Sequence, residues 1–110
     1  MEKLPQHLFI YGTLANEPIQ KEVGLTFESV HQYDYIKGYA LKEIYYEGYG
    51  TFLSAYKCDN GIISGRVLLD ANLPQCIETL NEYEGEQYEL VEVETCVNKF
   101  KCAFYCEKIN

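Results

Sequence analysis

A glutamate near the end of a helix-like segment is the residue best placed to do chemistry. Residues 72–84 carry apolar side chains at the i, i+3, i+4, i+7 spacing of one buried helix face: Leu73, Cys76, Ile77 and Leu80. At about 100° per residue this face continues to Glu84, whereas Glu78 and Glu82 fall on the opposite side. Burial raises the pKa of a carboxylate, as a general acid/base near neutral pH requires. The alternative is a helix end that frays, with Glu84 turned to solvent.

The loop Tyr11-Gly12-Thr13-Leu14 is a second candidate, and it ends an apolar run at residues 8–11. Such a run is typical of a strand buried on both faces. Gly12 permits close backbone approach, and amides of residues 12–14, just before a helix predicted to start at Asn16, are suited to hold a carboxylate. The second glycine and the Lys-Ser/Thr pair of a phosphate-binding loop are absent. A plain strand-to-helix turn is the alternative interpretation.

The cysteines indicate neither a metal site nor a disulfide framework. There are five of them, an odd number, and none forms a Cys-x-x-Cys pair. Cys102 and Cys106 fall in a strand-like segment, where we expect small buried side chains. We therefore expect no metal, reduced thiols and a cytoplasmic protein.

Composition excludes several classes of protein. We expect residues 1–110 to form one domain, and a hydrophobic fraction of 47% is typical of a folded chain. The net charge of −8 argues against a nucleic-acid partner, because phosphate contacts need clustered lysine and arginine. No apolar stretch is long enough to span a bilayer, and Pro5 interrupts the N-terminal one, so we expect neither a membrane partner nor a signal peptide.

The elements that would position these residues indicate an α+β fold with a mixed or antiparallel sheet that closes into a small barrel and two short flanking helices. Helices are predicted between Asn16 and Gly24 and over residues 72–84, the second capped by Asn72. Asp59-Asn60-Gly61 predicts a hairpin turn, and Gly65 indicates a bulge or a close backbone approach. Strands are expected over residues 8–11, 35–46, 51–56, 62–69, 91–97 and 100–106.

Several motifs, in register over residues 7–106, resemble the γ-glutamylcyclotransferase-like superfamily, and within it the AIG2-like and γ-glutamylamine cyclotransferase branch. They are the Tyr-Gly-Thr-Leu loop at 11–14, Gly-Arg-Val-Leu-Leu-Asp at 65–70, Leu-Asn-Glu-Tyr-Glu-Gly at 80–85, Tyr88, Val-Glu-Val at 91–93 and, more loosely, Ala-Phe-Tyr at 103–105. Asn81 stands where the family usually has aspartate, and Leu90 where an arginine is common. Ala15 replaces a larger polar residue, and residues 47–51 lack a proline found in many members.

The resemblance implies a barrel-like domain with a cavity, and Glu84 as the catalytic acid/base. It implies that Tyr11, Gly12, Thr13 and Leu14 bind the γ-glutamyl group through backbone amides, with Tyr88 closing one wall. The substrate would be a γ-glutamyl amine or peptide, cyclised to 5-oxoproline without cofactor or metal. Two alternatives are a non-catalytic binding module on the same fold and removal of a γ-glutamyl group from a larger amine. The sequence leaves the oligomeric state open.

Overall fold

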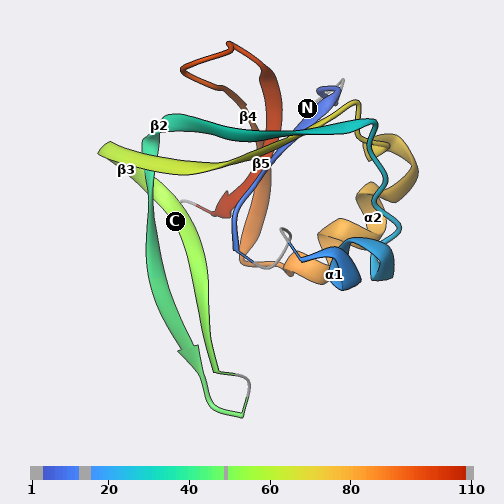
Figure 1. Cartoon of the computed structure of the whole chain (residues 1–110). Helices are drawn as coiled ribbons and strands as arrows, with labels where there is room; N and C mark the ends of the chain where they lie inside the picture. Colours follow the sequence, from blue (N-terminus) through green and yellow to red (C-terminus); the bar gives the residue numbers. More distant parts are fainter. Residues whose placement is uncertain (1–3, 13–15, 49, 109–110) are drawn as a thin grey trace.

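The computed structural model describes residues 4–12, 16–48 and 50–108 (Figure 1). In chain order the elements are β1 (His7–Ile10), α1 (Glu17–Glu22), β2 (Ser29–Tyr46), β3 (Gly50–Leu69), α2 (Leu73–Glu84), β4 (Tyr88–Glu94) and β5 (Lys101–Glu107). This combination of strands and two short helices confirms the predicted α+β class. Neither helix in the described ranges has the length and apolar character needed to cross a membrane.

The strands form one mixed sheet in the order β2-β3-β1-β5-β4. β1 runs parallel to β5 and antiparallel to β3, and the remaining neighbours are antiparallel. The expected barrel stays a prediction, since no ladder joins the edge strands β2 and β4 in the described part of the chain. The sheet nevertheless curls strongly, because the Cys96 N–H, just after β4, donates a hydrogen bond of 2.8 Å to the Tyr35 carbonyl of β2.

The centre of the sheet is buried on both faces. Leu8 of β1 packs with Leu73 of α2 on the face that the helices cover (Figure 1). Phe9 points to the opposite face, where its ring meets Phe104 of β5 at a centroid distance of 5.9 Å. Alternate residues of β1 therefore enter two different clusters, which confirms the prediction of a strand buried on both faces.

The hairpin predicted at Asp59-Asn60-Gly61 is wrong, because β3 is continuous through these residues. Lys37 pairs with Ile62 and Tyr39 with Lys57, so residues 58–61 of β3 bulge opposite Gly38 alone. A Cβ on Gly61 would lie 2.3 Å from the Tyr39 carbonyl oxygen. The glycine thus permits close backbone approach inside a bulge, not a chain reversal.

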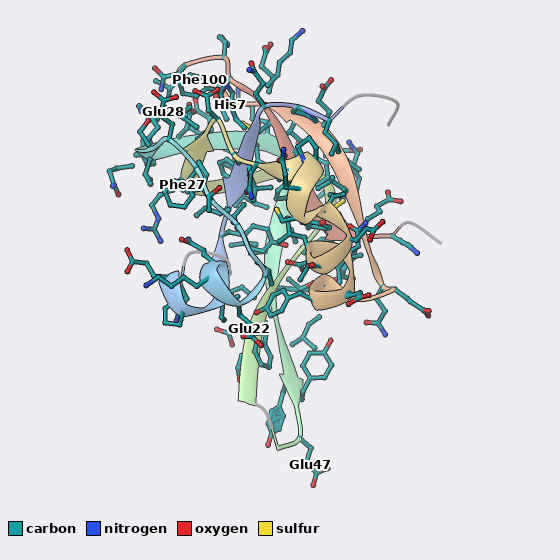
Figure 2. All side chains as sticks on the ribbon, turned by 90° about the vertical axis from the view of Figure 1, so that its right-hand side faces the viewer. His7, Glu22, Phe27, Glu28, Glu47 and Phe100 are labelled. Carbon is teal, nitrogen blue, oxygen red and sulfur yellow. The ribbon has the colours of Figure 1, made fainter. Side chains whose placement is uncertain are left out.

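The chain reverses instead between Tyr46, where β2 ends, and Gly50, where β3 begins, which agrees with the predicted break between the strands at 35–46 and 51–56. Between the bulge and this reversal, β2 and β3 form a two-stranded arm, residues 39–48 and 50–57, that projects from the rest of the molecule (Figure 1). Glu47 marks the far end of this arm in Figure 2. The arm therefore reaches away from the sheet centre and provides a surface beside it.

Helix α2 follows the predicted pattern, with Leu73, Cys76 and Leu80 buried. Asn72 occupies the predicted N-cap position, but its side chain makes no capping hydrogen bond to α2. Its amide oxygen accepts from the Thr26 N–H at 2.7 Å, and its amide nitrogen donates to the Gly24 carbonyl at 3.0 Å. Asn72 therefore fastens the start of α2 to the segment that follows α1.

Candidate functional site

A cavity of about 460 Å³ lies between the end of α2, the strands β1 and β5, and the arm. Three of the described residues that line it are predicted site residues: Tyr11, Glu84 and Tyr88. The other described lining residues are apolar or aromatic: Phe9, Ile10, Tyr46, Phe52, Leu53, Tyr83 and Tyr105. Among the described residues, Glu84 is thus the only charged side chain in the wall.

Glu84 is the last residue of α2, and its side chain faces the cavity. The helix ends there because Gly85 takes a φ of +92°, while its N–H donates to the Asn81 carbonyl at 2.9 Å. Among the described residues, no hydrogen bond or ion pair to the Glu84 carboxylate is found. Burial without a compensating donor raises the pKa of Glu84 to about 7.

Two tyrosines next to Glu84 direct their hydroxyl protons elsewhere. The Tyr11 hydroxyl donates to the Tyr105 backbone carbonyl at 2.9 Å. The Tyr105 hydroxyl donates to the Asn81 side-chain oxygen at 2.7 Å. Burial, and secondly the charge of Glu84, raise the pKa of both phenols, so each hydroxyl stays protonated and neutral at neutral pH. Neither hydroxyl proton therefore compensates the Glu84 carboxylate.

The third tyrosine, Tyr88, begins a chain of polar contacts that leads to the surface. Its hydroxyl lies 2.6 Å from the Ser54 Oγ on the arm. Ser54 in turn donates a short hydrogen bond to Glu107 at the end of β5. The other carboxylate oxygen of Glu107 lies 3.1 Å from the Lys42 Nζ. Partial burial disfavours ionisation of Glu107, but the Ser54 and Lys42 contacts outweigh it and lower its pKa.

This arrangement has a clear chemical consequence. A carboxylate with a pKa near 7 can both accept and return a proton at neutral pH. The hydroxyl oxygens of Tyr11, Tyr88 and Tyr105 have hydrogen-bond partners other than Glu84 and keep lone pairs, so this part of the wall favours a hydrogen-bond donor such as an ammonium group. The site is suited to proton transfer from a bound amine.

The structure brings three of the sequence-predicted site residues, Glu84, Tyr11 and Tyr88, to the same cavity. Gly12 has a φ of +60°, and a Cβ there would lie 3.8 Å from the Cβ of Leu53, a residue of the cavity wall. Thr13 and Leu14 lie outside the described residues, as does Ala15. Binding of a carboxylate by the amides of residues 12–14 therefore stays a prediction.

Sequence reasoning missed Ser54, Glu107 and the arm residues of the wall. The alternation of side chains along β5 could have indicated Glu107. Tyr105 packs on the helix face of the sheet, and Glu107, two residues later in the strand, points to the same face. Nothing local marks Ser54, which reaches Glu107 only because the arm folds beside β5. A contact between segments this far apart in the chain can be predicted only when the strand order is known.

The described residues hold no group of three or more histidine, cysteine or acidic side chains suited to a metal ion. All five cysteines are free thiols, and Cys102 and Cys106 are buried as predicted. Their sulfur atoms pack in the cluster around Phe9 and Phe104, on the face of the sheet away from the helices. They therefore contribute to packing and not to the cavity.

Comparison with known proteins supports a family assignment. The family described as "Gamma-glutamyl cyclotransferase, AIG2-like" matches residues 8–108. An uncharacterised protein from Pyrococcus horikoshii is 26% identical, with a TM-score of 0.64, and the match covers 94% of this chain and 79% of that one. No curated protein matches the chain significantly.

Two further solved structures share the fold at lower identity. One, titled gamma-glutamyl cyclotransferase, is 18% identical with a TM-score of 0.67, and the match covers 93% of this chain and 66% of that one. The other, from Arabidopsis thaliana, is 18% identical with a TM-score of 0.65, over 97% of this chain and 71% of that one.

Proposed function

The chain belongs to the gamma-glutamyl cyclotransferase, AIG2-like family, and from this premise we propose that it cyclises γ-glutamyl amides to 5-oxoproline and a free amine. The observation that carries the proposal is the Glu84 carboxylate, which faces the cavity with a pKa of about 7 and no hydrogen-bond donor among the described residues. A non-catalytic binding module has no need for such a poorly compensated carboxylate.

The reaction requires one group that moves a proton twice. Glu84 accepts a proton from the α-ammonium group of the substrate, and the freed amine attacks the γ-carbonyl carbon. A carbon–nitrogen bond forms and closes a five-membered ring, while negative charge develops on the carbonyl oxygen. The bond to the leaving nitrogen then breaks, and Glu84 returns this proton to that nitrogen. Glu84 then passes the second proton from the ring nitrogen to the departing amine, so the α-ammonium group loses two protons in all and the amine leaves as an ammonium group. The enzyme is unchanged, and no external oxidant or reductant is needed.

The wall on the arm side suggests which amine leaves. Tyr46, Phe52 and Leu53 form an apolar surface there, and the rings of Tyr46 and Phe52 lie 5.7 Å apart. In the described part of the chain, no lysine, arginine or histidine lines the cavity. We therefore propose that leaving amines with an apolar or aromatic group react better than peptides that carry a free carboxylate.

The free thiols suit a reducing compartment, so a cytoplasmic location is part of the proposal.

The test is release of 5-oxoproline from a panel of γ-glutamyl amides and dipeptides, measured for the natural protein and for Glu84→Gln. Glutamine keeps the size of the side chain but cannot act as an acid or a base near neutral pH. We expect the natural protein to turn over at least one amide and Glu84→Gln to lose about 100-fold or more in kcat. The matched control is Glu82→Gln, on the solvated side of the same helix, which keeps full activity.

Three results would contradict the proposal in different ways. No turnover of any amide, together with measurable binding of the panel, would favour the binding module. Equal activity of the natural protein and Glu84→Gln would remove Glu84 from the acid/base role. Turnover restricted to large γ-glutamyl conjugates would favour the removal of a γ-glutamyl group from a bulky amine.

A further inference from the structure

The polar chain behind Tyr88 fixes the direction in which its hydroxyl proton points. Ser54 has a single hydroxyl proton, and it is donated to Glu107, which is an anion because its pKa is lowered. The Ser54 oxygen therefore acts as an acceptor in its 2.6 Å contact with Tyr88. It follows that Tyr88 donates to Ser54 and has no proton left for the cavity.

The end of this chain keeps it in one arrangement. Lys42 lies on the arm, its side chain is 48% exposed, and it holds the outer oxygen of Glu107 at 3.1 Å. Ser54 is buried, so its contacts with Tyr88 and Glu107 are protected from competing water. The chain crosses from β4 through the arm to β5 and does not depend on Glu84.

We infer that the Ser54–Glu107–Lys42 chain keeps the Tyr88 proton away from Glu84, so that the Tyr88 oxygen and the Glu84 carboxylate together accept hydrogen bonds from the ammonium group of the substrate. In this arrangement Tyr88 touches the substrate, while Ser54 and Glu107 are positioning residues. The role of the substrate ammonium rests on the proposed function, whereas the position of the Tyr88 proton follows from the structure alone.

Within residues 4–12, 16–48 and 50–108, the other titratable groups that face the cavity with Glu84 are tyrosines from the neighbouring elements. They are Tyr11 after β1, Tyr46 of β2, Tyr83 of α2 and Tyr105 of β5, and β3 contributes only the apolar Phe52 and Leu53. Tyr11 donates to a backbone carbonyl and Tyr105 to Asn81, and neither of these contacts involves Ser54. Removing Ser54 should therefore free the proton of Tyr88 alone.

The first experiment follows the titration of the Glu84 carboxyl carbon by NMR in the full chain. In Ser54→Ala, Tyr88 loses its acceptor and can turn its proton to Glu84, so the titration midpoint should fall by about 1 pH unit. In Ser54→Ala/Tyr88→Phe no such proton exists, and the midpoint should return to that of the natural protein. An unchanged midpoint in Ser54→Ala, or an equal fall in the double variant, would overturn the inference.

A second variant protects this test against a folding defect. Glu107→Gln keeps the side-chain shape but removes the anion that fixes the Ser54 proton, so the Glu84 midpoint should again fall. Glu92→Gln on β4 makes the same change in net charge at an exposed position and should leave the midpoint unchanged. Equal midpoints in these two variants would contradict the role of Glu107.

The second experiment tests the ammonium contact in the Glu84→Gln background, where turnover does not interfere. The probes are γ-glutamylmethylamide and glutaric acid monomethylamide, which lacks only the amino group. Adding Tyr88→Phe should weaken binding of the first probe by about 10-fold and leave the second unchanged. Equal effects on both probes, or no binding of either, would overturn the ammonium contact. Absence of turnover in the natural protein, by contrast, would overturn only the proposed reaction.

Discussion

The Tyr105 hydroxyl donates a hydrogen bond of 2.7 Å to the side chain of Asn81, which lies one helical turn before Glu84 on α2. This contact fixes a tyrosine of β5 against the end of the helix that carries the candidate acid/base. The family pattern that the sequence resembles has aspartate where this chain has Asn81. A neutral amide accepts the same hydrogen bond without placing a second negative charge beside Glu84.

The first prediction concerns this position and the pH dependence of activity. Glu84 must be ionised to accept the substrate proton, so kcat/KM should rise with pH through an apparent pKa near 7. Asn81→Asp adds a nearby like charge, which should move this rise upward by about 1 pH unit. Thr79→Asp adds the same charge to the exposed side of α2 and should not move it. A common shift in both variants would show a general charge effect instead.

The second prediction is that Glu84 costs stability where it is ionised. Its folded pKa of about 7 lies above the ordinary 4.5, so ionisation weakens the folded state as pH rises from 4.5 to 7, and the loss then levels off. Glutamine resembles the neutral acid, so Glu84→Gln should be more stable by about 2 kcal/mol at pH 8 and equally stable at pH 4. Urea denaturation of both proteins at the two pH values measures this, and a gain that persists at pH 4 would contradict it.

The third prediction concerns the apolar wall of the arm. Removing the ring in Tyr46→Ala should lower kcat/KM by about tenfold for a γ-glutamyl amide with a phenyl-bearing leaving group, because apolar contact is lost. The value for γ-glutamylmethylamide should change little. Tyr45→Ala is the matched control, since Tyr45 is 67% exposed and does not line the cavity. An equal loss with both substrates would show that Tyr46 supports the structure and not the selection of the amine.

The helix periodicity placed Glu84 on the buried face of α2 but left open a frayed helix end with Glu84 turned to solvent. An amphipathic pattern depends on neighbours within a few residues, and α2 keeps this pattern from Leu73 to its last turn. Burial raises the pKa of Glu84, however, and that burial is provided by segments far from α2 in the chain. The hydrogen bonds of the three neighbouring tyrosines likewise run to groups on β3, β5 and α2. Those contacts join segments far apart in the chain, and no local pattern encodes them.

The predicted hairpin at residues 59–61 failed for a related reason. Asp-Asn-Gly has the composition of a tight turn, and composition is all that a single segment provides. In the fold, β2 pairs with both halves of β3, and this long ladder outweighs the local preference for a turn. The same residues become a bulge, at which the arm departs from the sheet.

The fourth prediction tests the close approach that Gly65 was expected to mark. A Cβ on Gly65 would lie 2.4 Å from the Ile10 carbonyl oxygen, a backbone atom that cannot move aside without shifting β1. Gly65→Ala should therefore lower the free energy of unfolding by about 3 kcal/mol. Gly48→Ala, with open space around it and a φ of +86°, should cost only about 1–2 kcal/mol. Equal losses in the two variants would mean that crowding at Gly65 is relieved by small movements.

A buried carboxylate of β2 holds the curl of the sheet in place, and no sequence pattern predicted it. Asp34 accepts hydrogen bonds from the backbone amides of Tyr35 at 2.8 Å, Val97 at 2.9 Å and Asn98 at 3.2 Å. Burial disfavours its ionisation, but the Val97 and Tyr35 amides, the Thr95 hydroxyl and the Asn98 side-chain amide lower its pKa to about 2. The turn between β4 and β5 is thereby fastened to β2.

The fifth prediction follows from this lowered pKa. The folded value of about 2 lies below the ordinary 3.8, so the stabilisation by Asp34 is complete above pH 4 and is lost as pH falls toward 2. Asp34→Asn should lower the free energy of unfolding by about 3 kcal/mol at pH 6, because an amide N–H₂ would face backbone N–H groups. Between pH 4 and pH 2 the free energy of unfolding should fall by about 2 kcal/mol more in the natural protein than in Asp34→Asn. Urea denaturation across this range measures the difference, with the exposed Asp59→Asn as control. Parallel losses in the natural protein and Asp34→Asn would assign the acid sensitivity to other carboxylates.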